Sequence, residues 1–173
     1  MSPDATSEDL DPRAPIVDTA TFTLLTELEL RQAIRLQHYV SLLVLQMDVD
    51  QPGQSADVAM LHRLIAEVVR DQIRSTDAVS VTPTPPHVQI LLVSAYLDNL
   101  PAIIERIAAA VNGRAFEVQG GSAHVTLSIG AACFPTTAQV RTELFHQAVS
   151  LSAEARDETG ALGHRYRLAR RMT

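Results

Sequence analysis

Hydrophobic residues follow two spacings along this chain, one typical of helices and one typical of buried strands. Segments with an apolar residue at every third or fourth position predict helices over residues 21–37, 55–74, 99–111 and 136–155. Short apolar runs rich in β-branched residues predict strands over residues 40–50, 77–81, 87–93, 115–119, 123–134 and 164–168. No internal repeat is visible.

The order of these elements predicts a single mixed sheet. Two helices are each followed by a pair of strands, and each pair is joined by a short break, TPTPP at residues 82–86 and Gly120-Gly121. A strand, a tight break and a second strand favour a hairpin. Buried strands interrupted by helices predict an α+β sandwich with a ferredoxin-like core, as in nucleotide cyclases.

Composition bounds the class of protein. The chain has 173 residues, of which 46% are hydrophobic, enough for one domain with a substantial core. We expect a disordered acidic arm over residues 1–20, a domain over 21–169 and a basic tail over 170–173. The N-terminal stretch has no apolar run typical of a signal peptide, and no run is long enough to insert in a membrane, so a cytoplasmic location is expected.

Charge and rare residues narrow the possible partners. The net charge of −6 argues against general binding to nucleic acid. All 14 basic residues are arginine, which excludes chemistry that needs a lysine amine. The single cysteine, Cys133, lies in an apolar strand and is expected to be a buried, inert thiol. The six histidines are scattered without the spacing of a metal site.

Several segments, taken in order, resemble the GGDEF domain of diguanylate cyclases over residues 22–167. They are LLVLQMDVD, which ends in Asp48 and Asp50, then IRSTDAVSV, HVQILLV and LPAIIERIAAAV, and finally VTLSIGAACFP at Val125–Pro135. The last segment is close to the family's valine-serine-isoleucine-glycine strand. The resemblance implies the cyclase fold and a place in cyclic di-GMP signalling.

The reactive centre of that family is not matched. Its Gly-Gly-Asp/Glu-Glu-Phe loop is replaced by Pro83-Thr84-Pro85-Pro86-His87, which offers no glycine for close approach to GTP and no carboxylate for a metal. Asp48 is then a relic at a strand end, because a lone strand-end pair of carboxylates holds Mg²⁺ poorly. The segment after Asp50 is too short for the family's GTP pocket. The sequence therefore predicts no catalytic residue, no metal and no cofactor.

A second nucleotide site of the family is matched. Its product-binding inhibitory site has an Arg-x-x-Asp motif before the hairpin and a second arginine on the next helix, which the resemblance assigns to Arg74, Asp77 and Arg106. Arginine forks can pair with guanine or phosphate, and the aspartate can accept from guanine N–H groups. We therefore expect a catalytically inactive domain that acts as a cyclic di-GMP receptor.

Plainer roles for the three residues remain open. Arg74 can stabilise a helix C-terminus, Asp77 can cap a turn, and Arg106 can make a surface ion pair. The alternative function is a nucleotide-independent interaction module that docks a protein partner of a signalling or export system. The arginines of the tail would then be a solvated end or a contact to an acidic partner.

Overall fold

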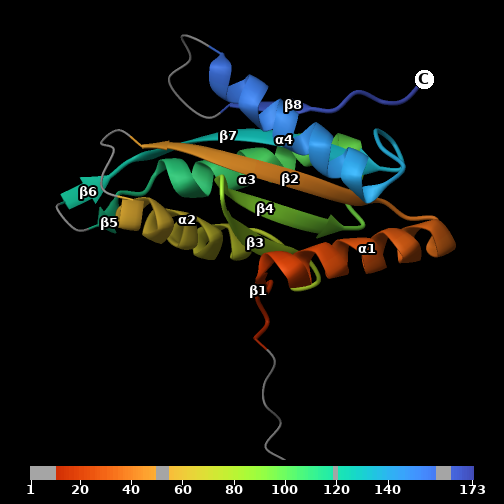
Figure 1. Ribbon diagram of the computed structural model, residues 1–173, viewed down its shortest axis with the longest axis horizontal. Helices are drawn as coiled ribbons and strands as arrows, with labels where there is room; N and C mark the ends of the chain where they lie inside the picture. The colour runs from red at the N-terminus through yellow and green to blue at the C-terminus, as the bar shows by residue number, and fades with distance from the viewer. Residues whose placement is uncertain (1–10, 50–54, 119–120, 159–164) are drawn as a thin grey trace, which may run out of the picture.

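The computed structural model describes residues 11–49, 55–118, 121–158 and 165–173 of the chain (Figure 1). The elements follow in the order β1 (Ile16–Val17), α1 (Thr19–Leu36), β2 (Val40–Val49), α2 (Ser55–Arg70), β3 (Ala78–Pro83), β4 (Pro86–Val93), a 3₁₀ turn η1 (Leu97–Asn99), α3 (Leu100–Asn112), β5 (Phe116–Val118), β6 (Gly121–Ala123), β7 (Val125–Phe134), α4 (Arg141–Asp157) and β8 (Arg165–Leu168). The predicted turn after Asp50 lies outside the described residues. No helix in the described ranges is long and apolar enough to cross a membrane.

Six strands form one mixed sheet in the order β1-β3-β4-β2-β7-β8. The central strand β2 is antiparallel to both neighbours, with Val44 opposite Gln89 of β4 on one side and Gly130 of β7 on the other. The pairs β1–β3 and β7–β8 are parallel. The predicted α+β fold with a mixed central sheet is confirmed.

Helices cover both faces of the sheet (Figure 1). Leu43 and Leu45 point into a core shared with α2 and α3, whereas Leu42 and Val44 point into a second core shared with α1 and α4. Because successive side chains of a strand point to opposite faces, a stretch buried on both sides favours apolar residues at consecutive positions. This is why Leu42–Leu45 at the centre of β2 is an uninterrupted apolar run.

The second predicted hairpin forms, but its second strand is not the predicted 123–134. β5 pairs antiparallel with the short β6, with Phe116 opposite Ala123, in a separate two-stranded sheet. The long strand β7 instead pairs with β2 along one edge and with β8 along the other. A local turn pattern predicts a hairpin but does not show which strands share a sheet.

The break between the two strands of the first hairpin is shorter than the predicted residues 82–86. Pro83 ends β3, Pro86 begins β4, and the two lie opposite each other at the end of the ladder. Only Thr84 and Pro85 remain as the turn. At the last pair of a hairpin, a residue without an N–H group costs little because few ladder hydrogen bonds remain to be made.

Two helix ends also differ from prediction. Helix α2 ends at Arg70, and the next residues form turns, with the Gln72 N–H donating to the Val69 carbonyl at 2.9 Å. Helix α4 begins at Arg141, because the segment before it folds back on β7 through a 2.7 Å hydrogen bond from the Thr137 N–H to the Cys133 carbonyl.

The predicted disordered arm is partly ordered. Residues 1–10 lie outside the described part, but Ile16 and Val17 add a parallel strand beside β3. Asp18 then caps α1, its carboxylate accepting from the Thr21 N–H at 2.7 Å. At the other end of the chain, Arg171 of the predicted tail forms an exposed ion pair with Asp98 at 2.7 Å.

Helix α4 lies directly on β7 at Gly130. A Cβ atom added there would sit 2.1 Å from the Ala148 carbonyl oxygen and 2.3 Å from the Ser152 nitrogen, both backbone atoms of α4. Backbone cannot yield as a flexible side chain can. The close approach of this helix to the sheet therefore requires glycine at position 130.

We expect Gly130→Ala to destabilise the fold by about 3 kcal/mol or more, at or above the upper end of ordinary overpacking costs, because α4 must move off the sheet. The measurement is the free energy of unfolding in urea. Gly113→Ala is the matched control, since its added Cβ would lie 3.9 Å from the nearest backbone atom, and it should change stability little. Equal effects of the two substitutions would contradict the packing argument.

Candidate ligand-binding site

The Arg-x-x-Asp motif forms a closed turn between α2 and β3. The Asp77 N–H donates to the Arg74 carbonyl at 2.9 Å, and the Arg74 N–H donates to the Asp77 carboxylate at 2.8 Å. Aspartate favours such turns because its side chain reaches a backbone N–H nearby in sequence. The turn fixes the point from which the Arg74 side chain leaves the backbone.

Asp77 also ties this turn to the end of β4. Its second carboxylate oxygen accepts from the Val93 N–H at 2.8 Å, and the residue is only 4% exposed. Burial raises the pKa of Asp77, and the hydrogen bonds from Val93 and Arg74 together with the nearby Arg74 and Arg106 charges offset part of that increase. Both oxygens are thus engaged by backbone, which is the turn-capping role that the sequence left open.

Arg106 approaches the same turn from α3. Its Nε and Nη2 atoms donate to the Gln72 carbonyl oxygen at 3.0 and 2.6 Å. A guanidinium has five N–H groups, so the others stay available for a ligand. The surface ion pair that the sequence offered as an alternative is not what the described residues show, because the partner is a backbone carbonyl.

Arg74, Asp77 and Arg106 line one hollow of about 210 Å³. The sequence-predicted residues therefore meet at one place, and Ser94 and Asn99 are further polar residues of the lining. Sequence reasoning missed these last two. Ser94 has a φ of +61°, and its N–H donates to the Tyr39 carbonyl. Glycine or asparagine usually marks such a backbone position, so no residue pattern could have identified it.

The residues that the resemblance places near the cyclase reactive centre lie at the opposite end of the sheet. The Asp48 carboxylate is paired with Arg156 of α4 at 2.7 Å. At the hairpin tip, the Thr82 hydroxyl donates to the Pro85 carbonyl at 2.8 Å. Asp50 lies outside the described residues. Among those described, no three His, Cys, Asp or Glu side chains gather as a metal site.

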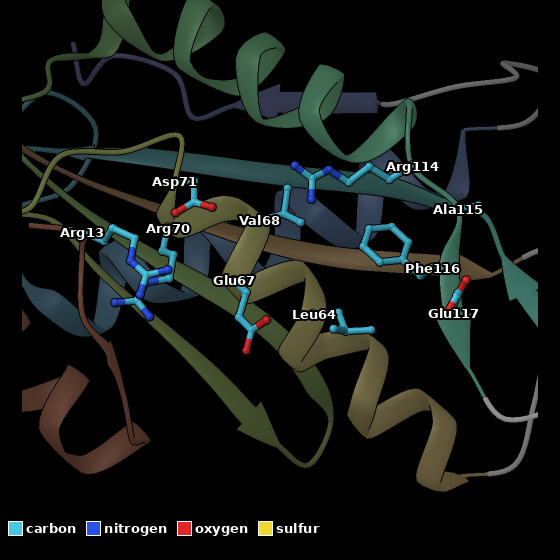
Figure 2. A pocket seen from close by; sticks show the side chains of 10 residues that line it. All are labelled: Arg13, Leu64, Glu67, Val68, Arg70, Asp71, Arg114, Ala115, Phe116 and Glu117. Carbon is cyan, nitrogen blue, oxygen red and sulfur yellow. The ribbon is translucent and has the colours of Figure 1, made fainter. Parts of the chain in front are cut away.

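A wider hollow of about 510 Å³ lies between α2 and β5 (Figure 2). Three arginines and three carboxylates line it together, so neither sign of charge dominates. Arg70 is already used there, donating to the Ala14 carbonyl at 2.9 Å and to Asp11 at 3.1 Å. Figure 2 shows Arg13 beside Arg70 at one end and Arg114 at the other, so no set of polar groups converges on one point.

Among known proteins, the chain is similar to solved structures. Neither a protein-family model nor a curated protein matches the chain. The GGDEF domain of YfiN (TpbB) from Pseudomonas aeruginosa is similar with a TM-score of 0.74 and 23% identity, covering 88% of this chain and 96% of that one. The GGDEF domain of FimX from the same organism has a TM-score of 0.74 and 19% identity, with 87% and 94% covered.

A third similar structure contains a ligand. The coiled coil and GGDEF domain of DgcB from Caulobacter crescentus, in complex with c-di-GMP, has a TM-score of 0.67 and 11% identity, covering 90% of this chain and 81% of that one. The agreement extends over nearly the whole chain in each comparison. This chain therefore has the GGDEF-like fold that the residue pattern predicted.

Proposed function

We propose that this chain is a catalytically inactive GGDEF-like domain that binds cyclic di-GMP through Arg74 and Arg106. The observation that carries the proposal is their convergence, with Asp77, on one hollow of about 210 Å³. A cavity of about 150 Å³ accepts benzene, so this hollow has room for one guanine ring system, while the rest of the ligand would lie outside. DgcB, which shares the fold, was solved with c-di-GMP bound.

Each arginine has N–H groups available for the ligand. The Arg74 side chain has no hydrogen-bond partner within the described residues, and Arg106 uses only Nε and Nη2 on the Gln72 carbonyl. Fork-shaped donors recognise guanine O6 and N7 or a phosphate by paired hydrogen bonds. Asp77 acts mainly by holding the turn, and its oxygens keep lone pairs that can accept from a guanine edge.

Loss of catalysis is the second part of the proposal. The hairpin tip supplies prolines and threonines where a two-metal reaction needs carboxylates. Asp48 is neutralised by Arg156 at 2.7 Å, so its charge is already balanced without a cation. The chain also has no lysine, so no lysine side chain could hold the triphosphate of GTP.

A nucleotide-independent interaction module is the alternative function. Helix α1 exposes several large apolar side chains, with Leu24 at 59%, Ile34 at 67% and Leu36 at 63% exposure. Exposed apolar groups that gather on one helix are typical of protein contacts. Under this alternative, the turn and the hollow would be inherited architecture without a ligand.

Calorimetry with cyclic di-GMP separates the two functions. We expect binding that Arg74→Ala weakens by about tenfold or more, since a charge-assisted hydrogen bond contributes more than a neutral one. Arg106→Lys should also weaken binding, because it keeps the charge but loses the fork. Arg63→Ala, which removes an exposed arginine of α2, is the control and should bind normally. No heat from the wild-type protein at high micromolar ligand would refute the receptor proposal.

Asp77→Asn tests whether the carboxylate holds the turn. An amide presents one acceptor oxygen where the carboxylate presents two, so one of the N–H groups of Arg74 and Val93 loses its partner. We expect a loss of about 1–3 kcal/mol in the free energy of unfolding. Asp98→Asn, at an exposed ion pair, is the control and should cost less than about 1 kcal/mol. If Asp77→Asn leaves the free energy of unfolding unchanged, the two hydrogen bonds contribute little to stability.

Incubation of the pure protein with GTP and Mg²⁺ or Mn²⁺ tests the loss of catalysis. We expect no linear or cyclic dinucleotide by chromatography, because the described hairpin tip offers no carboxylate to hold a second cation. The same assay with an active diguanylate cyclase is the control. Formation of cyclic di-GMP by this chain would refute the proposed loss of catalysis. The proposed binding of cyclic di-GMP is tested separately by the calorimetry.

A further inference from the structure

A second cavity lies on the other face of the sheet, where α1 and α4 diverge above β3 and β4. Its volume is about 220 Å³. Phe22 of α1, Leu42 of β2 and Phe145 of α4 are its apolar walls, and Gln89 of β4 lies in the lining. The core on this face is built from α1 and α4, so the cavity is separate from the Arg74 hollow.

Gln89 is the unusual member of the lining. The residue is only 3% exposed, and no hydrogen bond joins its carboxamide to the described residues. Its amide atoms are not among the fully buried atoms without a partner, so they are open to the cavity that they line. The other buried polar side chains of the lining are satisfied, since the Thr26 hydroxyl donates to the Phe22 carbonyl and the Thr82 hydroxyl to the Pro85 carbonyl, both at 2.8 Å. The Gln89 amide is therefore the polar group of the lining that a molecule inside the cavity can pair with.

Two further unsatisfied groups lie beside Gln89 in the sheet. Ser80 is opposite Gln89 in the β3–β4 register, and His87 is two residues before it on the same face. Ser80 Oγ and His87 Nε2 are buried and have no partner among the described residues. Burial and the nearby His62 lower the pKa of His87, so its ring is neutral near pH 7. The ring also contacts Phe145, at 6.1 Å between centroids.

Charge in the lining is balanced. Arg141 is the lining cation, and its Nε donates to Glu27 of α1 at 2.7 Å. A ligand that enters here therefore meets apolar walls, a neutral imidazole nearby and a carboxamide. A carboxamide presents a donor and an acceptor side by side, which matches the edge of another amide.

We propose that this cavity binds a small, uncharged, planar molecule whose amide-type edge pairs with the Gln89 carboxamide. A cavity of about 150 Å³ holds benzene, so 220 Å³ has room for one six-membered ring with a small substituent. The ring would lie among Phe22, Leu42 and Phe145. The amide edge would satisfy the group that the fold leaves without a partner.

Benzamide is the probe. Toluene, which lacks the amide, and benzoate, which carries a charge in its place, are the matched control molecules. We expect benzamide to raise the Tm of the full chain with increasing concentration and to shift the backbone NMR resonances of β3, β4 and α1. Toluene and benzoate should bind more weakly. Gln89→Leu should weaken benzamide binding by about tenfold, the equivalent of one hydrogen bond. No benzamide binding, or equal binding to the variant, would overturn the proposal.

The stability of the probe-free variants gives a second test. Gln89→Leu should raise the urea midpoint, because a leucine of similar size replaces an unsatisfied amide. Gln46→Leu is the control on the same face of the sheet, and it should lower the midpoint because the Gln46 amide donates to Ser152 Oγ at 2.9 Å. A lower midpoint for Gln89→Leu would show that its amide has a structural partner and would refute the site. Cyclic di-GMP binding at Arg74 should be unchanged in Gln89→Leu.

Discussion

The structure depends on the burial of the first part of its central strand, Val40–Leu45, where every residue is buried. β2 is hydrogen-bonded to β4 on one edge and to β7 on the other, and helices cover both its faces there. This part of the strand offers no free edge, so both helical layers are needed to remove its apolar side chains from water. Hollows are then found where the covering helices end or diverge.

The hollow at Arg74 and the cavity at Gln89 differ in how their polar groups are satisfied. At the turn before β3, the buried Asp77 carboxylate receives hydrogen bonds from the Arg74 and Val93 N–H groups. Under α1 and α4, Gln89 is equally buried and has no partner among the described residues. A satisfied buried group stabilises local structure, whereas an unsatisfied one favours whatever can complete it. The first arrangement positions arginines, and the second leaves a place for a ligand.

The Arg-x-x-Asp turn and the hairpin tip lie at opposite ends of β3. Asp77 precedes the strand, whereas Thr84 and Pro85 form the hairpin tip at its far end, on the side of the sheet where Asp48 pairs with Arg156. The hydrogen bonds at one end share no residue with those at the other. A substitution at the tip can therefore leave the turn that holds Arg74 undisturbed.

Local pattern was enough for what depends on neighbours in sequence. The apolar run of β2 indicated a doubly buried strand, and Arg-x-x-Asp indicated a turn before β3, because burial periodicity and side-chain capping act over a few residues. Tertiary structure alone decided the partners: that β7 pairs with β2 and β8 rather than with residues 115–119, that Asp77 reaches Val93, and that Gln89 lines a cavity between α1 and α4. These outcomes depend on which distant segments meet, and a spacing along the chain carries no information about that.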